Sequence, residues 1–382
     1  MSKTQALRLG IVGLGNIGQV YLGLLNSGEV QRVVVTAVAS RTKPANTSIP
    51  HFGDYRAMLG SGLIDAVLIA TPTMWHPEMA AAAVAERLHV LVDKPLAMSV
   101  AQAKEMIRQA PADRHFAVML NQRYHPCYQK LHELLRAGVI GAVTRVSWTM
   151  TAWYRPDVYY QVSEWRGTWA GEGGGLLINQ CIHNLDVLQW LTGLPAQVRG
   201  TASFGKHHNI DVEDEFSALL RYRSGATGTI VASSGEAPGL NQLDLIGDRG
   251  TLRFDGQVIT LSRCDSSVAE HCRGTDEMFG QPQFETEAVL VTDHGTSQHA
   301  QVLQNFVDAV LDDVPLATPA TAGLDCLHLA NGILLSAWTD TTVDLPLDAQ
   351  RYEALLAERV GAGTLRSVGD REVNIDMGKS FR

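Results

Sequence analysis

The sequence has 382 residues, of which 45% are hydrophobic and 19% charged, with a formal net charge of −9. A chain of this length exceeds one ordinary core and fits two domains. The negative charge and the absence of a Lys/Arg cluster argue against nucleic acid as a partner, and the longest apolar runs are too short to span a bilayer. Five scattered cysteines without a CxxC pair indicate reduced thiols of a cytoplasmic protein, with neither a disulfide frame nor a metal site.

The first third of the chain alternates short apolar runs with amphipathic ones. Strands are expected at residues 7–12, 33–39, 66–70, 88–92 and 116–120, and helices at 16–25, 77–87 and 99–109. Pro77 suits a helix start and Ser99 an N-cap. Residues 41–49, interrupted by Pro44, are too few for a crossover helix. Strands that alternate with helices at this spacing predict a parallel, doubly wound sheet.

The pattern changes after about residue 125. Closely spaced strands, split by turn pairs such as Ser224-Gly225, favour an antiparallel sheet with one face against helices. Residues 262–299 are polar and lack clear periodicity, which we interpret as a long loop. The expected strands lie at residues 215–222, 226–233, 242–246 and 251–254, and the expected helices at 127–137, 181–191, 299–311 and 324–337.

Gly13-Leu14-Gly15-Asn16-Ile17-Gly18 fits the pattern G-x-G-x-x-G between the first expected strand and helix. The first glycine permits a tight turn, the second lets the backbone approach a pyrophosphate, and the third lets helix and strand pack closely. The helix N-terminus then faces the anion. The motif predicts a dinucleotide site that includes Gly13, Gly15, Asn16 and Ile17.

The end of the second strand bears on which dinucleotide binds. NAD sites usually place Asp or Glu there, about 20 residues after the glycines, to bind the ribose 2′-hydroxyl. Here Ser40-Arg41 occupies that position, without a carboxylate. A hydroxyl and a guanidinium can bind a 2′-phosphate, so NADP(H) is favoured, with NAD(H) as the alternative. Arg41 would in that case be solvated.

Asp93-Lys94-Pro95 follows the fourth strand. Ligands of open α/β sheets bind in the crevice at the carboxyl ends of the strands, and Pro95 makes the exit from the strand rigid. The Lys94 ammonium would therefore face the occupant of that crevice. The alternative is a solvated lysine at a strand end.

With these motifs in order, the chain resembles the glucose–fructose oxidoreductase / inositol dehydrogenase / MocA family. Further similar segments are Ala70-Thr71-Pro72 with His76, Asn121 to Tyr124, Gly173 to Asp186, and Val343 to Leu347. The resemblance implies a Rossmann domain, which we place at residues 1–124. It also implies an α+β domain with a large, mostly antiparallel open sheet, at residues 125–382, that binds substrate and forms a homodimer or homotetramer. Cofactor contacts implied in this way are Thr71, Pro72, His76, Asp93, Lys94, Gln122, Trp165 and Arg166.

The implied reaction moves a hydride between nicotinamide and a secondary hydroxyl or ketone of a sugar, sugar derivative or cyclitol. A hydroxyl proton must also move, and histidine suits this because its pKa lies near neutrality. His183 is the expected acid/base, on a helical face shared with Asn179 and Asp186, and Lys94 would stabilise charge on the reacting oxygen. The family often has Asp at the position of Asn179, so Asp186 would have to supply the carboxylate. The alternative is that His183 has only a structural role, in which it caps a polar core helix or satisfies its hydrogen-bonding groups.

Aromatic residues and arginines precede the glycine triplet at 173–175. Aromatic faces with polar tips suit sugar rings, although an ordinary amphipathic hairpin is an alternative. Arg155 could instead recognise an anionic substituent. The expected substrate contacts are Lys94, Arg123, Tyr154, Arg155, Tyr159, Asn179, His183 and His299. Two other functions remain open: a redox-neutral glycosidase or lyase with bound NAD, and a sugar-sensing regulator without turnover.

Overall fold

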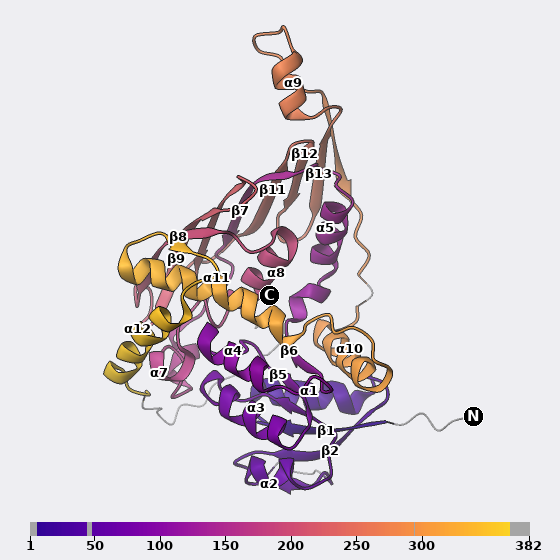
Figure 1. The fold of residues 1–382 in the computed structure, drawn as a ribbon, viewed down its shortest axis with the longest axis vertical. Helices are drawn as coiled ribbons and strands as arrows, with labels where there is room; N and C mark the ends of the chain where they lie inside the picture. Colours follow the sequence, from indigo (N-terminus) through magenta and orange to yellow (C-terminus); the bar gives the residue numbers. More distant parts are fainter. Residues whose placement is uncertain (1–5, 44–47, 294, 367–382) are drawn as a thin grey trace, which may run out of the picture.

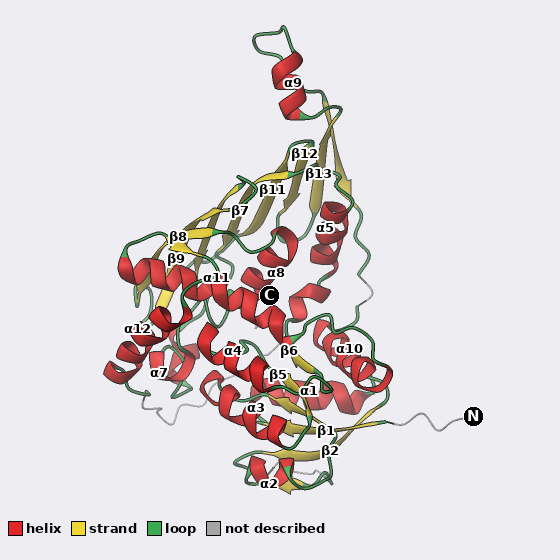
Figure 2. Ribbon diagram, in the orientation of Figure 1, coloured by secondary structure: helices red, strands yellow, loops and turns green. Residues whose placement is uncertain are grey.

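The computed structural model describes residues 6–43, 48–293 and 295–366. It contains two β-sheets with helices packed against them (Figures 1 and 2). The first sheet is parallel, with the strand order β3-β2-β1-β4-β5-β6. Its strands are β1 (Leu7–Val12), β2 (Val33–Ala39), β3 (His51–Phe52), β4 (Ala66–Ile69), β5 (His89–Val92) and β6 (Phe116–Val118). This is the strand order of a dinucleotide-binding Rossmann sheet, and it confirms the predicted doubly wound fold.

Helices and short connections link these strands. The helices are α1 (Asn16–Ser27), α2 (Tyr55–Leu59), α3 (His76–Ala85) and α4 (Val100–Gln109), and the 3₁₀ turns are η1 (Thr73–Trp75) and η2 (Asn121–Tyr124). The Ser99 side chain accepts a hydrogen bond from the Gln102 amide, as expected of an N-cap. The central strands β1 and β4 are almost wholly apolar because they are buried on both faces.

The second sheet has nine strands in the order β14-β13-β12-β11-β7-β10-β9-β8-β15. Only β7 and β10 pair in parallel; the other pairs are antiparallel, as expected. The strands are β7 (Val143–Met150), β8 (Gln197–Phe204), β9 (Glu213–Arg221), β10 (Thr227–Ser233), β11 (Asn241–Gly247), β12 (Gly250–Phe254), β13 (Ile259–Cys264), β14 (Phe284–Val289) and β15 (Val343–Asp344). In β9, Phe216 and Leu220 are buried while Ser217 and Leu219 are exposed, so one face of the sheet is covered and the other is open.

Helices cover the buried face of this sheet (Figure 2). They include α8 (Ile182–Thr192) and α11 (Ala320–Thr339), which pack against each other, while α5 (Pro126–Arg136) packs against α8. The remaining helices are α6 (Asp157–Gln161), α7 (Trp169–Glu172), α9 (Val268–Gly274), α10 (Gln298–Asp312) and α12 (Ala349–Ala362). No helix in the described ranges is long and apolar enough to cross a membrane.

Residues 262–299 are not the long loop that the sequence suggested. They include the end of β13, helix α9, strand β14 and the start of α10, and the α9 segment projects beyond the body of the molecule (Figure 1). Strand β14 pairs along its whole length with β13. Five of its six residues are exposed, so it has no buried face that would give an apolar–polar alternation in the sequence.

Helix α10 packs on the first sheet although it follows the second sheet in the chain. Its buried apolar residues share a core with the strands β1, β2 and β4. Phe306 and Leu303 are each 1% exposed in that core. The last part of the chain thus returns to the Rossmann sheet, and a domain boundary between residues 124 and 125 stays a prediction.

Candidate active site

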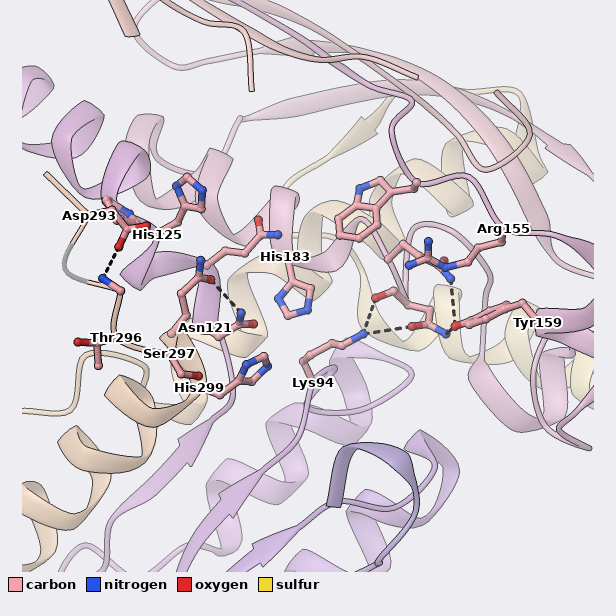
Figure 3. Close-up of a pocket in the computed structure, with 17 residues that line it drawn as sticks. Lys94, Asn121, His125, Arg155, Tyr159, His183, Asp293, Thr296, Ser297 and His299 are labelled. Carbon is pink, nitrogen blue, oxygen red and sulfur yellow. Dashed lines mark hydrogen bonds between the residues drawn. The ribbon is translucent and has the colours of Figure 1, made fainter. Parts of the chain in front are cut away.

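A cavity of about 370 Å³ lies where the two halves of the molecule meet (Figure 3). Its walls come from the segments that follow β5 and β6, from the segment before α6, from the start of α8, and from the N-terminal end of α10. Lys94, Gln122, Arg155, Tyr159, Asn179, His183 and His299 are the sequence-predicted residues that line it.

The glycine loop next to the first sheet is built for close packing and for a ligand. Gly13 has φ +93°, and a Cβ there would lie 2.5 Å from the Ala70 carbonyl oxygen. A Cβ on Gly18 would lie 2.0 Å from the Gly13 carbonyl oxygen. A Cβ on Gly15 would meet no atom within 4 Å among the described residues, and no side chain caps α1 there. The open space before Asn16 and Ile17 therefore fits a pyrophosphate.

The end of β2 carries hydroxyl and basic groups. The Ser40 hydroxyl donates to the Thr42 carbonyl at 2.7 Å and lies 3.2 Å from Nε2 of His51. Arg41 is exposed beside it. His51, which the sequence analysis did not single out, is brought to this position by the β2–β3 pairing. No Asp or Glu occurs from Val38 to Lys43.

Two expected cofactor contacts connect the loops around the cavity but do not line it. The ring nitrogens of His76 each lie 2.9 Å from a carbonyl oxygen, one of Thr71 and one of Pro95. Burial lowers the pKa of His76. Asp93 accepts a hydrogen bond from the buried Tyr21 hydroxyl at 2.7 Å. His76 and Asp93 thus fix the segments after β4 and β5 relative to each other and to α1.

Lys94 and His183 point into the same cavity (Figure 3). Nζ of Lys94 donates to the backbone oxygen of Asn179 at 2.8 Å and to its Oδ1 at 3.1 Å. Within the described part of the chain, Nδ1 of His183 is buried without a hydrogen-bond partner. Burial, with the nearby positive charge of Lys94, holds the pKa of His183 well below its ordinary value. The imidazole is therefore neutral at neutral pH and able to accept a proton.

Asn179 lies before α8 and not on its helical face, because α8 begins only at Ile182. The turn that contains Asn179 is held by Glu213, whose buried carboxylate accepts from the amides of Gly175 and Leu177 at 2.8 to 2.9 Å. Asn179 still reaches the cavity, and its Nδ2 donates to the Tyr159 hydroxyl at 3.1 Å.

The same amide group donates to Glu172, a residue that the sequence analysis missed. Glu172 is 2% exposed, and burial raises its pKa to about 7. A signal was present in the sequence: Glu172 is the only acidic residue between Trp165 and Asp186. The neighbouring glycines, Gly171 and Gly173 to Gly175, gave no indication that this carboxylate would be buried.

Arg123 and Asp186 are not brought to His183. Both carboxylate oxygens of Asp186 accept from Arg123, at 2.9 and 2.6 Å, and neither residue lines the cavity. The expectation that Asp186 supports the histidine and that Arg123 contacts substrate is corrected, since each neutralises the other. Tyr154 is 49% exposed and also lies outside the cavity lining.

Trp165 and Arg166 do not line the cavity. The Arg166 guanidinium lies 4.5 Å from the centre of the Tyr159 ring. The Arg155 guanidinium lies 5.3 Å from the centre of the same ring, so two cations lie close to Tyr159. On the opposite wall, the pKa of His299 is lowered to about 4, mainly by burial.

Comparisons with known proteins agree with this architecture. Residues 7–122 match the GFO/IDH/MocA oxidoreductase family, described as having an NAD-binding Rossmann fold, and residues 128–253 match the GFO/IDH/MocA C-terminal domain. The rhizopine catabolism protein MocA of Rhizobium meliloti is 30% identical over 190 residues, which cover 49% of this chain and 57% of MocA. Myo-inositol 2-dehydrogenase of Thermotoga maritima is 25% identical over 267 residues, covering 65% of this chain and 75% of that enzyme.

Solved structures share the fold over most of the chain. The WlbA dehydrogenase of Bordetella pertussis, in complex with NADH and UDP-GlcNAcA, matches with a TM-score of 0.76 and 25% identity, covering 90% of this chain and 100% of that one. Levoglucosan dehydrogenase in complex with NADH matches with a TM-score of 0.74 at 19% identity, covering 90% of this chain and 100% of that one, which is a likeness of fold alone.

Proposed function

The chain belongs to the GFO/IDH/MocA family of oxidoreductases, and from that premise we propose that it is an NAD(P)-dependent dehydrogenase acting on a sugar, sugar derivative or cyclitol. The observation that carries the proposal is that Lys94 and His183 face one cavity at the carboxyl end of a dinucleotide-binding sheet. Relatives named inositol dehydrogenase and levoglucosan dehydrogenase support the class of substrate.

The roles of the side chains follow from their protonation states. Neutral His183 accepts the proton of a secondary hydroxyl during oxidation and returns it during reduction. Lys94, held by Asn179, donates a hydrogen bond to the same substrate oxygen and stabilises its negative charge. When bound, the nicotinamide supplies the acceptor or donor of the hydride.

The choice of cofactor is part of the proposal. The NADH complexes among the related structures support a nicotinamide dinucleotide in general. The lack of a carboxylate at the end of β2, together with Ser40, Arg41 and His51, favours NADP(H). Ser40→Asp should then move the preference toward NAD by about tenfold or more, as measured by kcat/KM with each cofactor. If the ratio of kcat/KM with NADP to kcat/KM with NAD stays unchanged, the proposed preference for NADP(H) is wrong.

The experiment for the proposed function is a panel of polyols and sugars with NAD and NADP in parallel, followed by nicotinamide absorbance. Turnover that is lost in both Lys94→Met and His183→Ala supports the proposal, and turnover that survives in both overturns it. A redox-neutral glycosidase or lyase would instead form product without net change in absorbance. A sugar sensor would bind sugar but would neither form product nor change the nicotinamide absorbance.

A further inference from the structure

The buried carboxylate of Glu172 binds both a backbone amide and a side chain that lines the cavity. Oε2 of Glu172 accepts from the Gly167 amide at 2.6 Å, and Oε1 accepts from Nδ2 of Asn179. Asn179 in turn accepts from Lys94. A continuous chain of hydrogen bonds therefore runs from a buried carboxylate, through one amide, to the ammonium in the cavity.

The local sequence forces Glu172 inward. Helix α7 begins at its N-cap Thr168, whose hydroxyl accepts from the Gly171 amide at 3.1 Å, and ends at Gly173, which has φ +73°. A Cβ on Gly171 would lie 2.3 Å from the Trp165 carbonyl oxygen, and one on Gly173 would lie 2.5 Å from Cβ of Met98. Only glycine fits on either side, so the turn packs tightly and Glu172 is buried within it.

The polarity of the chain follows from what each atom can donate or accept. An ionised carboxylate only accepts, so Nδ2 of Asn179 must face Glu172, and Oδ1 must face Lys94. The Tyr159 hydroxyl oxygen, 3.1 Å from Nδ2, fits the same orientation. If Glu172 were neutral, Oε1 could carry the proton and would no longer be a strong acceptor for the amide.

We infer that Glu172 is a positioning residue of the proposed dehydrogenase: its carboxylate, acting through the Asn179 amide, holds the Lys94 ammonium in the orientation that serves the substrate oxygen. This rests on the proposed function. Glu172 does not itself line the cavity, so it acts through Asn179, which does, and through Lys94.

The charges around Glu172 make this link sensitive to pH. Burial raises the pKa of Glu172 to about 7, although the hydrogen bonds from Gly167 and Asn179 and the charges of Arg166 and Lys94 favour its ionised form. The other groups that interact with it are the buried Glu213 and Tyr160. The Lys94-dependent step should therefore weaken as pH falls through neutrality.

The decisive variant is Glu172→Gln, because a neutral amide offers one acceptor oxygen where Gly167 and Asn179 need two. We expect kcat to fall about 10²-fold, with KM for the cofactor changed by less than about threefold. The acidic limb of the pH profile of kcat/KM near pH 7 should disappear. The matched control is Glu213→Gln: this carboxylate is also buried and has a similar pKa, but its hydrogen bonds within the described ranges come from the backbone amides of Gly175 and Leu177. It should lower the midpoint of thermal unfolding but keep the acidic limb.

Moving the carboxylate from position 172 to position 179 tests whether Glu172 positions Lys94 or only maintains the structure. Asn179→Asp puts a carboxylate directly beside Lys94, and in the Glu172→Gln background it should recover about tenfold or more of the lost kcat. In the native background the introduced carboxylate would face that of Glu172, so Asn179→Asp alone should lower kcat. Equal kcat in Glu172→Gln and the native protein, or no recovery in the double variant, would overturn the inference while leaving the proposed function intact.

A measurement without turnover covers the case in which the proposed function fails. Burial lowers the pKa of Lys94, and the charges of Asp93 and Glu172 oppose that effect. Removing the Glu172 charge should lower the pKa further, so acetic anhydride should acetylate Lys94 faster at fixed pH in Glu172→Gln, by about threefold or more. Mass spectrometry of the Lys94 peptide gives the rate. An unchanged rate would contradict the link between the two residues.

Discussion

Arg123 binds both carboxylate oxygens of Asp186 in a two-point ion pair, with N–O distances of 2.9 and 2.6 Å. The side chain of Asp186 is 1% exposed and that of Arg123 is 11% exposed. Gln189 donates a further hydrogen bond to the same carboxylate at 3.0 Å. The pair joins η2 to α8 and so holds the segment after β6 against the helix that carries His183. Asp186 therefore supports the site by holding these two backbone segments together.

Arg123→Met should destabilise the protein far more than it slows turnover. It leaves the Asp186 carboxylate buried without its partner, which costs about 3–5 kcal/mol of unfolding free energy. The double variant Arg123→Met/Asp186→Leu removes both charges and should recover most of that loss. Urea unfolding measures the difference, and kcat in the double variant should stay within about threefold of the native value. If kcat instead falls well beyond about threefold in the double variant, Asp186 takes part in the reaction itself.

The glycine motif gives a second prediction because its positions have different surroundings. Gly15→Val points a side chain into open space, so the protein should fold with its native thermal midpoint but bind NADPH and NADH at least about 10²-fold more weakly. Gly18→Val would press on the Gly13 carbonyl oxygen and should prevent folding. Cofactor fluorescence and thermal unfolding separate the two outcomes. Native cofactor affinity in Gly15→Val would place the pyrophosphate elsewhere.

The sequence was sufficient for the fold wherever burial produced periodicity. Strands β1 and β2 were predicted at their observed bounds because each is a run of mostly apolar residues, most of them buried or half-buried. Strand β14 was not, since an exposed edge strand has no apolar face to reveal it. Helix α10 was found, but its packing on β1 could not be, because periodicity reports that a face is buried and not what covers it.

The same limit applies to the site. The motifs brought Lys94, Asn179 and His183 together correctly, because each lies at a defined point of a recognisable segment. Asp186 was placed beside His183 by helical spacing, and only the tertiary structure reveals that Arg123 occupies its carboxylate. Glu172 is the last residue of the short helix α7 and lies seven positions before Asn179. The segment between them belongs to no helix or strand, so no periodicity links the two residues.

The unfolding free energy should fall with pH below neutrality in part because His299 is buried. Its pKa is about 4 in the folded protein, lowered mainly by burial, against about 6.5 in an unfolded chain. The unfolded state therefore takes up the proton first, and this residue's contribution to stability is lost as pH falls from about 6.5 toward 4. Between pH 7 and pH 5, the native protein should lose about 2 kcal/mol more unfolding free energy than His299→Gln. Equal losses of unfolding free energy in the native protein and in His299→Gln, measured by urea unfolding, would contradict this prediction.

The open face of the second sheet should carry the predicted homo-oligomer. Leu219, on the exposed side of β9, is 59% exposed, and its neighbours Ser217 and Arg221 on the same side are exposed as well. A large apolar side chain at this position is stabilised if a second copy covers it, because its burial removes apolar area from water.

Leu219→Arg should therefore weaken self-association by about tenfold or more, since it would bury an unpaired charge in the interface. Val34→Arg is the matched control: Val34 is 53% exposed on a strand of the first sheet, away from this face. Sedimentation velocity over a range of concentrations gives the mass of each variant. A native mass for Leu219→Arg, or a monomeric native protein, would show that this face is not the interface. Dissociation by Val34→Arg alone would move the interface to the Rossmann sheet.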